Sequence, residues 1–302
     1  MKKRHSHSSV SDYLTCPRLY FLKQLERAEP DPTADRFNLD LGSAVHDGIE
    51  ASWLDDEDPV GSALGNLDRT VPLSSPVYMK ARAMLRAYIP MLGIHTELTA
   101  VVYKGAPLIE HYYRVPLPNG ATFSGKIDAV VHGPDGVTVI DWKTRKYHAP
   151  LSAVRLDAQL YLYEYVVREH LGIDVDAVAQ VQMLTTPPAV PGLTKDGKPS
   201  RSMGKTTEAA FVAALLHHDL DPAEYVARFT DKIVSYDHFL RWSHIQTGNY
   251  TKHLDAFMHQ IDRLSRDKVY PPVYRSNTCK WCDYQAYCLS PLDNSVLTGP
   301  AF

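Results

Sequence analysis

The first third of the chain has the spacing of apolar side chains that is typical of amphipathic helices. Apolar residues recur at three- and four-residue intervals over residues 9–28, 41–54 and 76–92, and this period predicts three helical segments. The first segment should break at Cys16-Pro17, because proline fits the first turn of a new helix, where no amide hydrogen is needed.

The middle of the chain changes to the composition and alternation of β-strands. We expect strands at residues 98–103, 108–116, 121–131 and 137–142, with turns at 118–120 and 134–136. A helix at about 155–170 and a strand at about 176–185 should follow. The pattern becomes helical again at about 207–218, 222–229 and 249–267. Helices before and after a mixed sheet predict an α/β fold.

The sequence contains no internal repeat and no clear linker. We therefore expect one domain over residues 1–302, elaborated at its ends. Residues 41–185 should form its core, and residues 187–206 form a loop rich in Pro, Gly, Lys and Ser.

The composition is that of an ordinary globular protein. The 302 residues are 44% hydrophobic and 22% charged, with a net charge of −3. A protein that only coats nucleic acid would usually be basic, whereas an enzyme that gathers carboxylates in its site need not be. No apolar run approaches the roughly 20 residues that span a bilayer, and none follows the basic N-terminus as in a secretory signal. We expect no membrane partner and a cytoplasmic location.

Two aspartates follow apolar residues of neighbouring predicted strands, at Asp128 and Asp141. Side chains alternate along a strand, so Asp141 and Lys143 should share one face while Trp142 lies on the other. The short hairpin between the strands can set Asp128 beside Asp141. Adjacent carboxylates repel unless a cation neutralises them, so the pair indicates a site for Mg²⁺ or Mn²⁺. Lys143 could orient or activate a water, or stabilise developing charge.

The alternative is that both aspartates are ordinary residues at strand ends. A single Asp-x-Lys occurs in many unrelated proteins and carries little weight alone. The position of both residues directly after apolar strand residues, at the mouth of a core sheet, favours the metal site.

Three short motifs in order resemble those of the PD-(D/E)XK nuclease superfamily, and specifically its RecB-like exonuclease branch. They are Gly125-x-x-Asp128, Asp141-x-Lys143 and Gln159-x-x-x-Tyr163. The resemblance implies a restriction-endonuclease-like sheet core and hydrolysis of DNA. It also implies that Gln159 helps to hold the site and the DNA, with Tyr163 beside it on the same helix face.

Two upstream residues acquire roles through the same resemblance. His46, in Gly-Ser-Ala-Val-His (42–46), matches a helix histidine that contributes a metal ligand in RecB-like nucleases. Glu110 resembles an auxiliary acid that some relatives carry on the strand before the Gly-x-x-Asp strand. Taken alone, His46 would more often be a packed core residue, and a solvent-facing strand glutamate explains Glu110 equally well.

The chain has four cysteines, one near the start and three in a Cys-x2-Cys-x5-Cys run near the end: Cys16, Cys279, Cys282 and Cys288. In a reducing cytoplasm four such residues indicate a metal site more than disulfides. It would join segments 9–28 and 270–290. The arrangement is similar to that of RecB-like nucleases of the AddB and CRISPR-associated exonuclease type, which implies a [4Fe–4S] cluster. Zinc is the competing occupant, although four-cysteine zinc sites usually arrive as two pairs.

The loop at 187–206 is basic and could contact the phosphates of a single strand. Its basic residues are Lys195, Lys198, Arg201 and Lys205. A solvated surface insertion explains the same composition. Gly204-Lys205-Thr206 superficially suggests a phosphate-binding loop, but that motif needs glycine at position 199, where Pro199 stands, so we expect no nucleotide cofactor. His5 and His7, in the N-terminal tail, are expected to be disordered.

Together these features predict a DNase that depends on Mg²⁺ or Mn²⁺, and the family resemblance implies exonuclease action at single-stranded ends. The resemblance suggests recombination, repair, or processing of viral or mobile-element DNA in a host-cell cytoplasm, where a helicase or recombination protein could be a partner. Two other classes remain open: a nuclease-inactive iron–sulfur or zinc scaffold that binds DNA, and a zinc-dependent structural protein. The polarity of digestion, exonuclease or endonuclease mode, DNA or RNA preference and oligomeric state are not specified.

Overall fold

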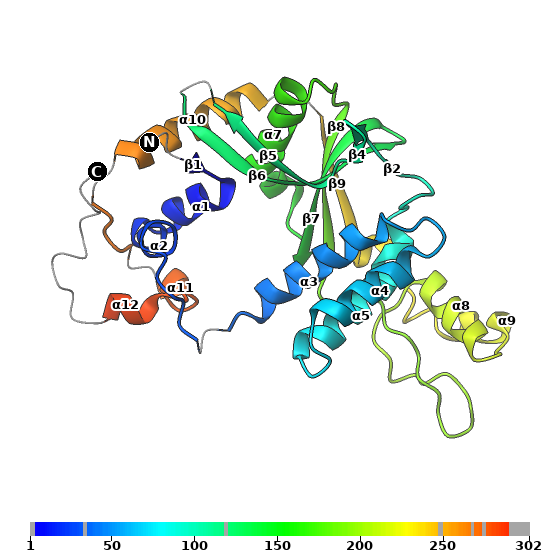
Figure 1. Cartoon of the computed structure of the whole chain (residues 1–302). Coiled ribbons are helices and arrows are strands. Elements are labelled where there is room, and N and C mark those ends of the chain that lie inside the picture. Colours follow the sequence, from blue (N-terminus) through cyan, green and yellow to red (C-terminus); the bar gives the residue numbers. More distant parts are fainter. Residues whose placement is uncertain are drawn as a thin grey trace.

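A mixed seven-stranded sheet forms the centre of the described part of the chain (Figure 1). The structure is a computed structural model that describes residues 4–32, 35–117, 120–246, 250–266, 269–273 and 276–289. Most of the expected turn at 118–120 therefore lies outside the described residues. The sheet contains β1 (Arg4–His5), β2 (Thr99–Ala100), β5 (Ile109–Pro116), β6 (Thr122–Gly133), β7 (Gly136–Arg145), β8 (Ala177–Leu184) and β9 (Leu240–Gln246).

The long strand β6 organises the sheet. It pairs antiparallel with β2, β5 and β7, and parallel with β1. β7 pairs parallel with β8, which pairs antiparallel with β9. A separate two-stranded ladder joins β3 (Val102–Tyr103) to β4 (Ala106–Pro107). The mixed α/β architecture predicted from the sequence is confirmed.

Three helices cover one face of the sheet (Figure 1). They are α3 (Phe37–Ser52), α4 (Pro59–Thr70) and α5 (Pro76–Tyr88), and a short 3-10 turn, η2 (Ile89–Met91), follows α5. The apolar side of these helices packs on Ala129 and Val131 of β6 and on Ile140 of β7. The pattern analysis missed α4, although Asp58 caps its first turn through the amide of Gly61 and Pro59 opens it.

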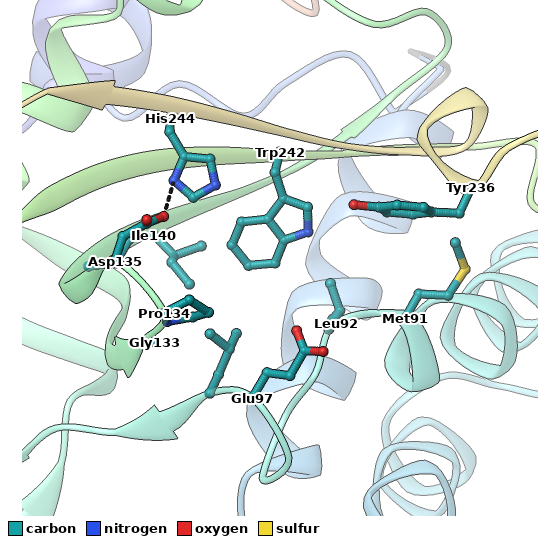
Figure 2. Close-up of a pocket in the computed structure, with 12 residues that line it drawn as sticks. Met91, Leu92, Glu97, Gly133, Pro134, Asp135, Ile140, Tyr236, Trp242 and His244 are labelled. Carbon is teal, nitrogen blue, oxygen red and sulfur yellow. Dashed lines mark ion pairs between the residues drawn. The ribbon is translucent and has the colours of Figure 1, made fainter.

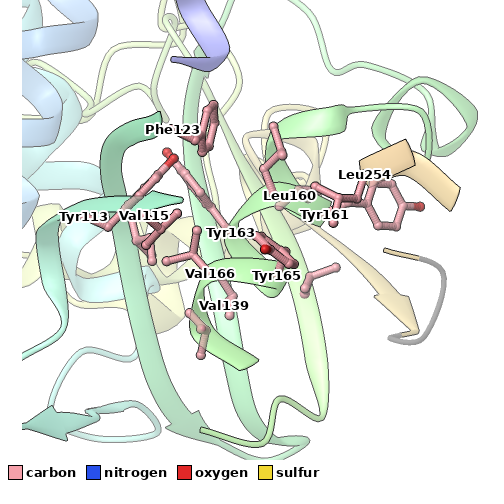
Figure 3. Packing of buried hydrophobic residues seen from close by; sticks show 14 of the residues in the cluster. Tyr113, Val115, Phe123, Val139, Leu160, Tyr161, Tyr163, Tyr165, Val166 and Leu254 are labelled. Carbon is pink, nitrogen blue, oxygen red and sulfur yellow. The ribbon is translucent and has the colours of Figure 1, made fainter. Parts of the chain in front are cut away.

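The second face is covered by α7 (Ala158–Tyr165) and α10 (Tyr250–Arg266), and Figure 3 shows part of this core. A short helix, α6 (Leu151–Val154), precedes α7, and a π-helical turn, η3 (Val166–His170), follows it. Val130 of β6 packs into this core while Ala129 and Val131 pack into the other. Both faces are buried, and the middle of the sheet is accordingly apolar at 129–131 of β6, at 139–140 of β7 and over most of β8.

The two ends of the described chain pack together. α1 (His7–Thr15), α2 (Pro17–Tyr20) and the π-turn η1 (Phe21–Leu25) come from the start, and α11 (Ser276–Cys279) and α12 (Gln285–Leu289) come from the end. Tyr13 and Phe21 share an apolar core with Tyr270 and Tyr284. The break expected at Cys16-Pro17 is present, with Cys16 in extended conformation between α1 and α2.

The expectation that His5 and His7 are disordered is wrong. Arg4 and His5 form β1 on the edge of β6, His5 is buried, and Ser6 caps α1 with a reciprocal bond to Ser9. The sequence did not reveal β1, because a strand of two residues has no periodicity to detect.

Strand β9 was also missed. The remaining helices and helical turns lie beyond the loop at 187–206: α8 (Glu208–His217), α9 (Pro222–Tyr225), η4 (Val226–Arg228) and η5 (Tyr236–His238).

None of the helices in the described ranges combines the length and the apolar character that crossing a bilayer requires. The longest of them, α10, carries a polar side and an apolar side, and Phe257 and Ile261 of the apolar side pack against the sheet. Its apolar residues are therefore part of the core.

Gly48 sets how closely α3 can approach α5. An added Cβ would lie 2.5 Å from Cδ1 of the buried Leu85, whereas a Cβ at Gly65 of α4 would lie 3.6 Å from its nearest neighbour. Both Gly→Ala changes gain about 0.5–1 kcal/mol of helix propensity, but Gly48→Ala also overpacks the core, at a cost of about 1–3 kcal/mol. Urea unfolding should show Gly48→Ala less stable than the control Gly65→Ala by that cost. Equal stabilities would contradict the close packing of α3 on α5.

Candidate metal and catalytic site

The site lies where β6 and β7 separate. Their backbone ladder pairs Ala129 with Ile140 and runs from there toward the hairpin. Asp128 and Asp141 are the next residues beyond the ladder, so they face each other across the two strands. Here the carboxylate of Asp128 accepts a hydrogen bond from the backbone amide of Trp142 (2.9 Å). Both aspartates are buried, with exposed fractions of 6% and 0%.

A histidine and a second acid complete a compact group of donors around Asp128. Nδ1 of His46 lies 3.5 Å from Oε1 of Glu110 and 3.7 Å from Oδ2 of Asp128. One ligand atom from each of these residues lies within 4.8 Å of the others, and no other His, Cys, Asp or Glu group in the described ranges is as compact. The residues come from α3, β5 and β6, so tertiary packing assembles them.

Glu110 occupies an unusual backbone conformation. Its φ is +46°, in the left-handed region that a residue with a Cβ rarely adopts. Such strain costs about 1–3 kcal/mol and is found preferentially at functional sites. The side chain is mostly buried and lies 3.4 Å from Nζ of Lys126, so the alternative of a solvent-facing glutamate is wrong.

Lys143 binds the second aspartate. Its Nζ donates to Oδ1 of Asp141 (2.6 Å) and to Oε1 of Gln159 (3.0 Å). Asp141 itself is outside the compact group around His46. The two aspartates therefore differ: Asp141 pairs with an internal cation, and Asp128 faces the histidine and the second acid.

Helix α7 contributes the remaining side chains of the network. Nε2 of Gln159 donates to Oη of Tyr163 (2.6 Å), and this hydroxyl donates to Oδ1 of Asp128 (3.1 Å). Burial and the nearby carboxylates hold the pKa of Tyr163 well above its ordinary value, so the hydroxyl stays protonated as a donor. Asp157 caps the helix through the amide of Gln159 (3.0 Å) and so fixes where α7 begins.

Gln180 is a part of the network that the motif analysis missed. It lies fully buried on β8, opposite Asp141 in the parallel register. Its Nε2 donates to Oδ2 of Asp141 (3.1 Å) and to Oδ2 of Asp157 (3.0 Å), and Arg145 donates to its Oε1. A buried glutamine needs such partners. Two glutamines within an otherwise apolar strand, Ala-Val-Ala-Gln-Val-Gln-Met-Leu, were a signal that could have identified it.

His7, which the sequence analysis expected to be disordered, lies near the site. It stands in the first turn of α1, and its ring stacks on Phe257 of α10 at 6.4 Å between centroids. Burial lowers its pKa, and the charges of Asp157, Lys143 and Asp141 also act on it. The N-terminal helix therefore reaches the electrostatic field of the site.

The metal-free site holds protons that a metal would have to displace. Burial and the charge of Asp141 raise the pKa of Asp128 to about 7. Burial alone would lower the pKa of His46, but its bond to Glu110 and the charges of Asp128 and Glu110 outweigh burial, so this pKa is raised. Burial also opposes the charge of Lys143, yet the carboxylates of Asp141 and Asp128 raise its pKa. Lys143 is therefore a cation at neutral pH.

The four cysteines line one cavity of about 60 Å³ between the two ends of the chain: Cys16, Cys279, Cys282 and Cys288. The amide of Val273 donates to Sγ of Cys16 (3.3 Å). No three of these sulfurs lie within 4.8 Å of one another. The structure thus brings the four side chains to a common cavity without the close spacing of a formed metal site.

The basic loop extends from the body of the molecule beside α8 and α9 (Figure 1). Arg201 forms a 2.9 Å ion pair with Asp231, and Lys205 donates to the backbone carbonyl of the same residue (2.6 Å). Lys195 and Lys198 are exposed. A role of this loop in binding DNA stays a prediction.

A mixed sheet flanked by helices, with acids and a lysine at the ends of adjacent strands, is the arrangement expected of a restriction-endonuclease-like core. The family model of the PD-(D/E)XK nuclease superfamily matches residues 4–289, and the chain belongs to this superfamily. The match does not extend to the RecB-like branch, which stays a prediction. A search of curated proteins found no significant match. Among solved structures, the chain is similar to SSO0001, with 11% identity, a TM-score of 0.39, and coverage of 97% of this chain and 89% of that one.

The raised pKa of Asp128 should make the metal-free protein less stable as pH rises. In the unfolded chain this carboxyl has a pKa near 4, so between about pH 4 and 7 the folded state holds the extra proton. The contribution of Asp128 to the free energy of unfolding therefore falls with rising pH across this window and levels off above it. Asp128→Asn should remove most of this slope. Thermal unfolding in a chelator from pH 5 to 8 tests this, with Asp196→Asn of the exposed loop as a control. An unchanged slope in Asp128→Asn would show that another group carries the dependence.

Proposed function

We propose that this protein is a divalent-metal-dependent DNA exonuclease of the RecB-like type, acting at single-stranded ends. The observation that carries the proposal is the group of His46, Glu110 and Asp128 beside the Asp141–Lys143 pair, on the sheet of a PD-(D/E)XK chain. Membership of the superfamily supports phosphodiester hydrolysis. The combination of motifs with a histidine from α3 supports the RecB-like branch.

The donor set fits Mg²⁺ or Mn²⁺. Carboxylate oxygens are the ligands that these hard cations prefer, and one imidazole is compatible with Mn²⁺. Asp128 and Asp141 are buried side by side, and a bound cation would offset the repulsion between them. His46, Asp128 and Asp141 would hold the ion, with Glu110 as an additional ligand. When bound, such an ion supplies an activated water and neutralises charge on the phosphodiester.

The protein's own side chains have separable tasks. Lys143 is protonated, so it can stabilise the negative charge that develops on the scissile phosphate during in-line attack. Gln159 holds Lys143 in place, and Tyr163 orients Asp128 through its hydroxyl. Because a protonated lysine cannot accept a proton, these contacts favour charge stabilisation over the role of a general base.

We also propose that the four cysteines bind a [4Fe–4S] cluster that joins the chain ends. The four cysteines line one cavity between the two ends of the described chain, as a single metal centre requires. Their one-plus-three arrangement in the sequence favours an iron–sulfur cluster over zinc, whose four-cysteine sites usually arrive as two pairs. Burial raises the pKa of Cys282 and of Cys288, so binding would release protons from these thiols. The cluster is structural in this proposal and presupposes a reducing compartment such as the cytoplasm.

The biological setting proposed for this activity is trimming of DNA ends in recombination, repair, or viral or mobile-element replication, with a helicase or recombination protein as a partner. The exposed Lys195 and Lys198 of the basic loop would add phosphate contacts that weaken with salt. A nuclease-inactive scaffold would share the fold and the cysteines. The charged Asp141–Lys143 pair, buried at a cost that a scaffold would not need, favours the enzyme.

Lys143→Ala should lower kcat for DNA cleavage by about 10²–10³-fold, because it removes one preorganised charge from the transition state. Binding of Mn²⁺, measured by calorimetry, should persist in this variant. Asp128→Ala should lose both cleavage and metal binding. The assay uses end-labelled single-stranded and double-stranded DNA, a circular control, and either Mg²⁺ or Mn²⁺.

Lys104→Ala, an exposed lysine remote from the network, is the matched control and should cleave like the parent. Full activity in Lys143→Ala would overturn the assignment of the site. Failure of the parent protein to cleave any DNA with either metal would favour the scaffold. Cleavage of the circular DNA would instead show an endonuclease.

Cys282→Ala should lower the free energy of unfolding by about 2–4 kcal/mol, the range for a cross-link that closes a long loop. The parent protein, purified without oxygen, should be brown and contain iron, and the variant should lose both properties. KM for DNA should rise more than kcat falls, because the metal ligands are elsewhere. Ser202→Ala, in the exposed loop, is the control. A variant as stable as the parent would remove the idea of a structural cluster, and zinc in place of iron would correct its identity.

A further inference from the structure

A cavity of about 440 Å³ lies between the β6–β7 hairpin, the segment that follows α5, and β9 (Figure 2). This volume is within the range of about 300–1,000 Å³ that small-ligand pockets have. Its lining includes Ile140 of β7, the residue before Asp141. Successive side chains of a strand point to opposite faces, so the side chains of Ile140 and Asp141 lie on opposite sides of β7. None of the proposed metal ligands lines the cavity.

The strand register brings lining residues of two strands to one face of the sheet. Ile140 of β7 pairs with Ala179 of β8, and Ala179 pairs in turn with His244 of β9, so Ile140 and His244 share that face. The turn at Gly133 to Asp135 and the loop that carries Glu97 form the sides of the cavity.

The chemistry of the lining is acidic and aromatic. Glu97 and Asp135 supply two carboxylates, and Trp242 and Tyr236 supply two aromatic rings. Figure 2 shows Trp242 projecting from β9 toward the middle of the cavity and the carboxylate of Glu97 directed inward from the opposite side. No lysine or arginine occurs among its lining residues within the described ranges.

The two carboxylates are not equally compensated. Asp135 lies 3.5 Å from Nδ1 of His244, whose ring also stacks on Trp242. Glu97 has no ion pair with any residue that the structure describes. The cavity also adjoins Met91 and Leu92, at the C-terminal end of α5 and η2, where the helix dipole is negative. All these charges favour a cation and disfavour a phosphate.

We infer that this cavity binds the guanidinium group of an arginine side chain that a partner protein presents. A guanidinium is planar, stacks on aromatic faces and forms paired hydrogen bonds with a carboxylate. Trp242 would provide the face and Glu97 the carboxylate. Tyr236 and Asp135 at the rim are more than half exposed. A cavity this open suits a side chain carried on a protein surface, because a free small ligand is usually buried over 70–90% of its own surface.

The test compares three probes by saturation-transfer NMR and calorimetry on the full chain: N-acetyl-arginine amide, the uncharged N-acetyl-citrulline amide, and the pentapeptide Gly-Gly-Arg-Gly-Gly. The arginine probes should bind, with the pentapeptide at least as tight, and citrulline should bind at least about five-fold more weakly. Glu97→Gln and Trp242→Leu should each weaken arginine binding by at least about five-fold, while Asp196→Asn leaves it unchanged. Metal-dependent DNA cleavage by Glu97→Gln should match the parent.

Equal binding of arginine and citrulline amides would overturn the inference, and so would an unchanged affinity in Glu97→Gln. Tighter binding of a deoxynucleoside monophosphate than of arginine would show a nucleotide site instead. Arginine amide binding with exclusion of the pentapeptide would show a small-molecule site and overturn the docking role. If Trp242→Leu unfolds, because Trp242 packs on Trp142, Glu97→Gln alone decides the outcome. None of these results depends on whether the chain is a nuclease.

Discussion

The separation of β6 from β7 is the constraint on which the rest of the structure depends. Backbone pairing ends at Ala129 and Ile140. Beyond it the backbone amide of Trp142 donates to the carboxylate of Asp128 in place of a backbone carbonyl of β6. This hydrogen bond fixes the Asp128 carboxylate inside the sheet, opposite Asp141. Burying two carboxylates together is costly unless each is compensated. The surrounding side chains supply the hydrogen bonds and the positive charge that stabilise the two carboxylates, and these side chains form the site.

The two aspartates are not stabilised equally, and this difference suggests that they have different tasks. Asp141 has an internal cation in Lys143 and a donor in Gln180, so part of its charge is compensated by the protein itself. Asp128 faces His46 and Glu110, and burial together with the charge of Asp141 raises its pKa. A divalent ion would therefore be attracted to the Asp128 side, while Lys143, held by Asp141 and Gln159, would act on substrate charge. The strained backbone of Glu110 is consistent with an acid that packing holds in place for this purpose.

The sequence could predict the parts of this arrangement that are local. Strand alternation places Asp141 and Lys143 on one face, and helix spacing places Gln159 near Tyr163. The link from Gln180 to Asp157 could not be predicted, because it depends on the parallel register between β7 and β8. The strands β1 and β9 were missed for related reasons: β1 has only two residues, and β9 adds to an edge that tertiary packing defines. The cavity beside Trp242 is lined by residues from separate segments of the chain and so has no linear motif.

Helix α1 connects the cysteine-lined cavity with the surroundings of the candidate site. His7 stands in its first turn, within the field of Asp157 and Lys143, and Cys16 follows directly after its last residue. Nine residues of helix are about 13 Å long, so a rigid displacement of α1 at Cys16 would also move His7. The parallel pairing of β1 with β6 fixes the other end of α1 to the strand that carries Asp128. The proposed cluster would therefore influence the catalytic edge through α1 even though no cysteine touches it. This coupling gives a physical reason for a nuclease core to have its two distant ends joined at one point.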